Sequence, residues 1–245
     1  RVYEAKKLYE QLIHLSGDPL MRMQAYLGKA DALYNLAEYN QAADAYREGL
    51  DKVDKFAVPN ELVDKMRHNL GLAYIKGGQV SSGISIFEDI LKETKDQAAN
   101  VSILFQIGDV YQDAGELVKA EEAYMRILKS YPNSTYADYA QYQIGSLQLR
   151  MLDYDQAVVT FKSLLKNYPQ SNLLADTFYS LGTAYLQKAD YADSFEIFSK
   201  FQSEFKDNPL RPQAFYMLGN SLLNLGKTNE ALSIFKEMLK LYPQD

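Results

Sequence analysis

The sequence predicts an all-α protein built as a solenoid of stacked, antiparallel helix pairs. Three observations carry this prediction. A pattern of small and aromatic residues returns along the chain with spacings of 37, 41, 37, 37, 37 and 37 residues. Within each repeat these residues fall at helical offsets. Proline, which interrupts helices, is scarce, with 7 residues among 245, and most prolines stand between the expected helices. A period in this range is typical of solenoids.

The second helix of each pair, called helix B, is marked by a small residue and by an aromatic residue four positions later. A third position, three residues further on, is mostly apolar, and offsets of 0, 4 and 7 share one face of an α-helix. The small residues are Ala5, Ala42, Gly83, Ala120, Ala157, Ser194 and Ala231, and the aromatic residues are Tyr9, Tyr46, Phe87, Tyr124, Phe161, Phe198 and Phe235.

The first helix of each pair, helix A, is marked by another small residue twelve positions before six of these anchors. These residues are Ala30, Gly71, Gly108, Gly145, Gly182 and Gly219. An aliphatic residue precedes five of them, and Lys29 breaks this pattern. A small side chain at this position lets helix B approach helix A closely, because a larger one would push the two axes apart.

Prolines and capping residues separate the pairs. The pairs Tyr131–Pro132, Tyr168–Pro169 and Tyr242–Pro243 end helix B, since proline cannot continue a helix interior. Ser134 and Ser171 are expected N-caps of the next helix A. Asn208–Pro209 places a cap and a first-turn proline at the equivalent point, and Asp18–Pro19 does nearly the same.

The spacing of 41 residues between Ala42 and Gly83 indicates four inserted residues. Asn60 is in register with Ser134 and Ser171, so the next helix A is expected to begin there and the insertion to fall within 51–59. Four residues are about one helical turn. We therefore predict that this helix B is extended by one turn.

These features predict a single solenoid domain over 1–245, with one helix B followed by six helix pairs. The pairs are expected at approximately 18–58, 59–95, 96–132, 133–169, 170–207 and 208–245. The chain opens at Arg1, with neither Met nor a signal-type segment, so we expect it to be a fragment of a longer chain.

Composition excludes several classes of protein. The 26 basic and 32 acidic residues give a net charge of −6 without a basic segment, so nucleic acid is not an expected partner. The absence of cysteine excludes disulfides, thiolate catalysis and Cys-based zinc sites. Only His14 and His68 are present, and we expect neither a metal nor a cofactor. No apolar run approaches the ~18 residues of a membrane span.

The small residues at a 12-residue offset, followed by an aromatic residue, resemble the tetratricopeptide repeat (TPR). The resemblance reads Leu70–Gly71…Tyr74…Gly83…Phe87 in one repeat and continues to Leu218–Gly219…Leu222…Ala231…Phe235 in the last. It implies a right-handed superhelix whose A helices line the concave face, with protein or peptide partners.

Two features depart from the usual TPR pattern. The family period is usually about 34 residues. Its tryptophan position is occupied here by Tyr26, Arg67, Leu104, Gln141, Phe178 and Phe215. The longer period and the Tyr-Pro-x-Ser linkers resemble bacterial extracytoplasmic TPR proteins, such as the Tol-Pal coordinator and the outer-membrane assembly lipoproteins.

The expected concave face carries a row of rings, one per repeat, three positions before the small residue. We call it the A-helix row: His68, Phe105, Tyr142, Tyr179 and Tyr216. Asp109, Arg150 and Asn220 are candidate polar contacts beside it. Such a row suits a peptide, because tyrosine combines an apolar ring with a polar tip. Alternatively, the rings only pack between neighbouring A helices; both interpretations stay open.

Catalysis requires a nucleophile with a base, convergent carboxylates or a metal, and the sequence offers no such set. His14 is expected in solvent near a helix end, and His68 belongs to the A-helix row. No phosphate-binding loop is present. The Lys–Asn pairs with which some TPR proteins bind a C-terminal carboxylate are also missing. We therefore expect a protein that is not an enzyme.

Two functions follow. The first is a scaffold that binds a peptide or partner segment in the concave groove, in bacterial envelope assembly. The alternative is a structural spacer or self-assembling element. The subgroup resemblance favours a periplasmic or outer-membrane-associated location, although the cytoplasm also suits a chain without cysteine.

Solenoids usually carry polar caps at their ends, and none is visible in this sequence, so self-association through uncapped ends is expected. The exposed apolar residues would be Leu232, Phe235, Met238 and Leu239.

Overall fold

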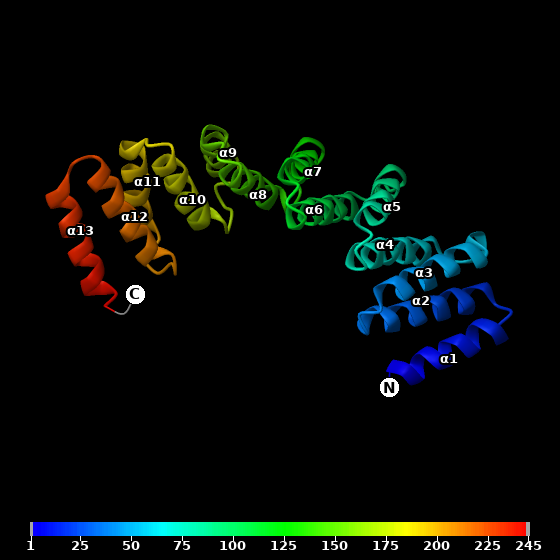
Figure 1. Cartoon of the computed structure of the whole chain (residues 1–245). Coiled ribbons are helices and arrows are strands. Elements are labelled where there is room, and N and C mark those ends of the chain that lie inside the picture. The colour runs from blue at the N-terminus through cyan, green and yellow to red at the C-terminus, as the bar shows by residue number, and fades with distance from the viewer. Residues whose placement is uncertain (1, 244–245) are drawn as a thin grey trace. The chain divides into compact units, whose positions relative to one another are not determined.

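The computed structural model describes residues 2–243. This part of the chain forms thirteen α-helices and one 3₁₀ helix, without a strand (Figure 1). The all-α repeat fold predicted from the sequence is confirmed. The helices are α1 (Val2–Leu15), α2 (Pro19–Asn35), α3 (Tyr39–Lys52), η1 (Lys55–Ala57), α4 (Asn60–Lys76), α5 (Val80–Glu93), α6 (Gln97–Asp113), α7 (Leu117–Ser130), α8 (Ala137–Arg150), α9 (Tyr154–Asn167), α10 (Leu174–Gln187), α11 (Tyr191–Glu204), α12 (Arg211–Asn224) and α13 (Thr228–Leu241).

The chain divides into two compact units, and each is described by itself. Unit 1 runs from Arg1 to Val110 and unit 2 from Tyr111 to Asp245, so the division falls inside α6. In unit 1, each of α1 to α4 packs against the helix that follows it, and in unit 2 the same holds from α7 to α12. The A helices also touch one another, α2 with α4 in unit 1 and α8 with α10 and α10 with α12 in unit 2.

The close contact between the two helices of a pair is made by an aromatic ring over a glycine. A Cβ built on Gly145 would lie 2.6 Å from the ring of Phe161, and one on Gly182 would lie 2.7 Å from the ring of Phe198. Both rings are fully buried. The predicted close approach at the small residue is therefore confirmed, and the group that fills the space is the aromatic residue of helix B.

The start of helix A differs in part from the prediction. The Asp18 carboxylate accepts a hydrogen bond from the backbone N–H of Leu20 at 3.1 Å and caps α2, as expected. Ser171 Oγ accepts from the N–H of Leu173 at 3.1 Å, and Asn208 Oδ1 accepts from the N–H of Leu210 at 2.8 Å.

However, α10 begins at Leu174 and α12 at Arg211, three residues after Ser171 and Asn208. Likewise, α8 begins at Ala137, three residues after Ser134. The N-cap prediction for Ser134, Ser171 and Asn208 was wrong, because these residues belong to a turn that precedes the helix. Side chains of this type bond the backbone two residues on in such turns, and Ser171 and Asn208 do so.

The four inserted residues do not extend helix B. Helix α3 ends at Lys52, and the chain then forms η1, in which Asp54 Oδ1 accepts a hydrogen bond from the N–H of Phe56 at 3.0 Å. Pro59 also disfavours helical backbone at the residue before it. The prediction of an extra helical turn was wrong, whereas the predicted start of α4 at Asn60 is correct.

Helix α13 leaves much of its apolar face open. Leu232 and Leu239 are 50% and 56% exposed, and Phe235 and Met238 are only partly buried. The sequence predicted an open apolar face at these four positions, and their exposure agrees with it.

Candidate functional site

Four members of the A-helix row contact the aromatic marker of helix B in their own pair, and Tyr179 also contacts Phe201 of α11 with centroids 6.5 Å apart. His68 of α4 stacks on Phe87 with centroids 5.5 Å apart. In unit 2, the centroid distances are 5.8 Å for Tyr142 and Phe161, 5.8 Å for Tyr179 and Phe198, and 6.1 Å for Tyr216 and Phe235. These four members of the row thus lie over the helix-B rings, which are fully buried except for the partly buried Phe235.

The polar atoms of two row members link neighbouring A helices. His68 Nε2 lies 3.0 Å from Gln106 Oε1 of α6, and Tyr142 Oη lies 3.3 Å from Ser180 Oγ of α10. His68, Phe105, Tyr142 and Tyr179 are partly buried. Packing between A helices therefore accounts for part of what these rings do. Tyr216 is different, since it is 51% exposed.

Two members of the row share a hollow in unit 2. Tyr179 of α10 and Tyr216 of α12 line a hollow of about 320 Å³ together with Pro212, Gln213, Met217 and Met238. Burial raises the pKa of Tyr179 above its ordinary value, so this hydroxyl stays neutral. Two rings, two thioethers and one amide give a largely apolar site of the kind that holds a side chain of a ligand.

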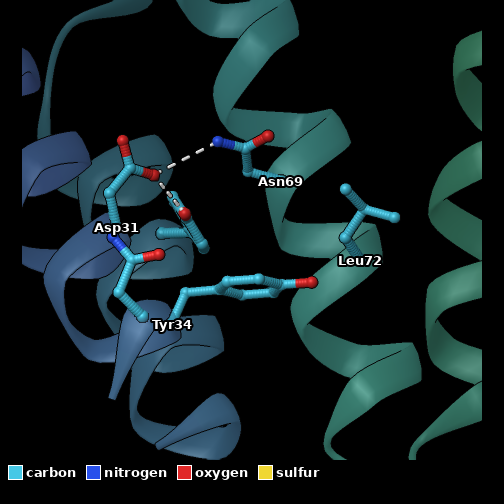
Figure 2. A pocket seen from close by; sticks show the side chains of 6 residues that line it. Asp31, Tyr34, Asn69 and Leu72 are labelled. Atoms are coloured by element: carbon cyan, nitrogen blue, oxygen red, sulfur yellow. Dashed lines mark hydrogen bonds between the residues drawn. The ribbon is translucent and has the colours of Figure 1, made fainter. Parts of the chain in front are cut away.

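A second hollow, in unit 1, is lined by residues outside the predicted A-helix row. It has a volume of about 270 Å³ and lies between α2 and α4 (Figure 2). Asp31 Oδ1 accepts hydrogen bonds from the hydroxyl of Tyr46 and, at 3.3 Å, from Nδ2 of Asn69. The remaining lining residues are Tyr34, Asn35 and Leu72.

The predicted row member His68 lines another hollow in unit 1. This hollow has a volume of about 480 Å³, and its polar lining includes Asp64, Lys65 and Ser102. The predicted polar contacts lie elsewhere. Asp109 and Arg150 are exposed near the ends of α6 and α8, and the backbone oxygen of Asn220 accepts a hydrogen bond from Asn224 at 2.9 Å.

The part of the chain that the structure describes contains no group of three or more His, Asp or Glu residues placed to hold a metal ion. Within the same residues, no helix combines the length and the apolar character that crossing a membrane requires. His14 is exposed in the last turn of α1.

Comparison with protein families identifies the repeat. A model described as tetratricopeptide repeat matches residues 103–134, and one described as outer membrane lipoprotein (YfiO) matches residues 138–245. These matches, together with the repeat fold, support a tetratricopeptide-repeat (TPR) family. No curated protein matched this chain.

Several solved structures are similar to this chain in fold. RapI in its apo form is 15% identical over all of this chain and 77% of that one, with a TM-score of 0.70. A tetratricopeptide repeat protein from Parabacteroides merdae is 18% identical over 89% and 79% of the two chains, with a TM-score of 0.58. MamA is 21% identical over 74% and 92%, with a TM-score of 0.59.

Proposed function

We propose that this TPR protein is a non-enzymatic scaffold that holds a peptide or partner segment against its A-helix face, in bacterial envelope assembly. One observation carries the proposal. The hollow between Tyr179 and Tyr216 joins an exposed aromatic side chain to an apolar site, and both tyrosines belong to the row that the sequence selected. Exposed tyrosines with an apolar ring and a polar tip often carry binding energy in protein interfaces.

The envelope setting is supported by the outer membrane lipoprotein model, whose match over residues 138–245 includes the whole of this hollow. We propose a periplasmic or outer-membrane-associated location on this basis. Nucleic acid is not a proposed partner, because the net charge of −6 opposes binding to phosphates.

The test is a quantitative capture experiment with three variants of the whole protein. Tyr216→Ala removes the exposed ring, Tyr216→Phe removes only the hydroxyl, and Glu196→Ala changes an exposed side chain of α11 as a control. The immobilised proteins are incubated with an extract of the host cells, and bound proteins are quantified by mass spectrometry.

We expect at least one protein that Tyr216→Ala loses by about tenfold, since a truncated interface anchor costs on the order of 1–2 kcal/mol. Tyr216→Phe and Glu196→Ala should retain it. Equal capture by all four proteins would reject the site.

A second candidate is a self-assembling or spacer element. It is favoured by the exposed leucines of α13, which form an apolar surface of the kind that covers itself by association. Loss of assembly after a change in α13, together with no effect of Tyr216→Ala on any partner, would favour this alternative.

A further inference from the structure

We propose that the hollow between α2 and α4 binds a lysine or arginine side chain of the protein partner, with Asp31 as its counter-ion. This inference rests on the proposed scaffold function and deepens it, because it states the chemistry of one residue that the partner presents. It concerns unit 1 alone and uses none of the residues of the Tyr179–Tyr216 hollow.

The carboxylate of Asp31 is held in place by two neutral donors. Tyr46 is 1% exposed and reaches Asp31 from α3. Asn69 reaches the same carboxylate from α4 (Figure 2). Burial and the hydrogen bond to Asp31 raise the pKa of Tyr46. The hydroxyl therefore keeps its proton and donates a hydrogen bond to Asp31. Both described bonds go to Oδ1, which leaves Oδ2 for a ligand.

Within the described residues, Asp31 forms no ion pair, and no basic residue lines the hollow. Neighbouring acids are different. Glu10 pairs with Lys29 at 3.2 Å, and Asp44 pairs with Arg47 at 2.6 Å. The negative charge of Asp31 is thus fixed at a partly buried position without a cation, and a charged group there gains from an opposite charge. A carboxylate ligand would face repulsion instead.

The remaining walls suit the rest of a basic side chain. The ring of Tyr34 lies below Asp31 (Figure 2), and Leu72 of α4 is also among the residues that line the hollow. Tyr39 packs edge-on against Tyr34 with centroids 5.1 Å apart, which fixes the ring. A cation is attracted to the face of such a ring, and the methylene groups of lysine or arginine can pack against Leu72. The volume of about 270 Å³ is several times the roughly 30 Å³ of one water molecule.

The experiment titrates the whole protein with Nα-acetyl-lysine-N-methylamide and follows the side-chain amide signals of Asn69 and Asn35 by NMR. The matched probe is the norleucine analogue, which has the same carbon chain without the ammonium group. We expect saturable shifts at both amides with the lysine probe, in the millimolar range, and at least fivefold weaker binding of the norleucine probe.

Two variants identify the counter-ion. Asp31→Asn removes the charge while retaining an oxygen that can accept a hydrogen bond from Tyr46. We expect this variant to bind the lysine probe at least fivefold more weakly than the parent does. Asp51→Asn removes the same charge at an exposed position of α3 and should change nothing. Unchanged binding by Asp31→Asn, equal binding of the two probes, or shifts that avoid Asn69 and Asn35 would each overturn the inference. None of these results bears on capture through Tyr216, so the two proposals fail separately.

Discussion

The ring of Phe198 lies against the backbone of Gly182, so close that a Cβ on the glycine would come within 2.7 Å of it. The opposite side of this contact leads to the candidate site, because Tyr179 packs on Phe198 with centroids 5.8 Å apart. The distance between α10 and α11 and the position of a site residue therefore depend on the same glycine.

Gly182→Ala should lower the free energy of unfolding by about 1–3 kcal/mol, because the added methyl group overpacks a buried ring. The higher helix propensity of alanine would by itself raise the free energy of unfolding by about 1 kcal/mol. Urea unfolding followed by circular dichroism measures the effect. Gly17→Ala is the control, since nothing lies within 4 Å of a Cβ there. A Gly182→Ala midpoint equal to or above that of the parent would show that the contact does not limit packing.

Tyr46→Phe should destabilise unit 1, because it removes a hydrogen bond to a carboxylate, a type worth about 1.5–3 kcal/mol. Ser85→Ala, at an exposed position of α5, serves as the control and should leave the unfolding midpoint unchanged. A Tyr46→Phe protein as stable as the parent would mean that Asp31 finds an equivalent donor in solvent.

The same variant tests a dependence on pH. The pKa of Tyr46 is raised above its ordinary value of 10.0 in the folded state, so the folded chain keeps a proton that the unfolded chain releases. The stability gained in this way is complete below about pH 10 and is lost as the pH rises above it. The difference in unfolding free energy between the parent and Tyr46→Phe should therefore shrink between pH 8 and pH 11. A constant difference would mean that the pKa is not raised.

Leu239→Glu should reduce self-association, because Leu239 is 56% exposed on the open apolar face of α13. Light scattering over a concentration series should show a rising mean mass for the parent and a smaller rise for the variant. Val118→Glu serves as the control, because it places the same charge at another exposed apolar residue, which lies in α7 and is 59% exposed. A parent that stays monomeric at every concentration would contradict the prediction.

The repeat register predicted the helices and the close approach of helix B to helix A at the small residue. That the aromatic ring of helix B fills this space was learned from the structure. The insertion was misread. A count of four residues fits one helical turn, but Asp54 and Pro59 instead favour a separate short turn.

The hollow at Asp31 escaped prediction for a different reason. The repeat pattern marks Tyr46 only as the aromatic residue of a helix B, whereas its hydroxyl reaches a carboxylate on the other helix of the pair. The signal was present in the sequence, since tyrosine rather than phenylalanine stands there with an aspartate fifteen residues earlier. The same combination of residue types recurs at Asp109 and Tyr124.

The most direct test of the scaffold proposal places a photoreactive phenylalanine analogue at position 216 of the whole protein in its host. A second protein carries the same analogue at position 196, on an exposed part of α11. After illumination, we expect a discrete crosslink to another protein from position 216, which Tyr179→Ala weakens, and none from position 196. Crosslinks of equal yield from both positions, or none from position 216, would contradict the scaffold proposal.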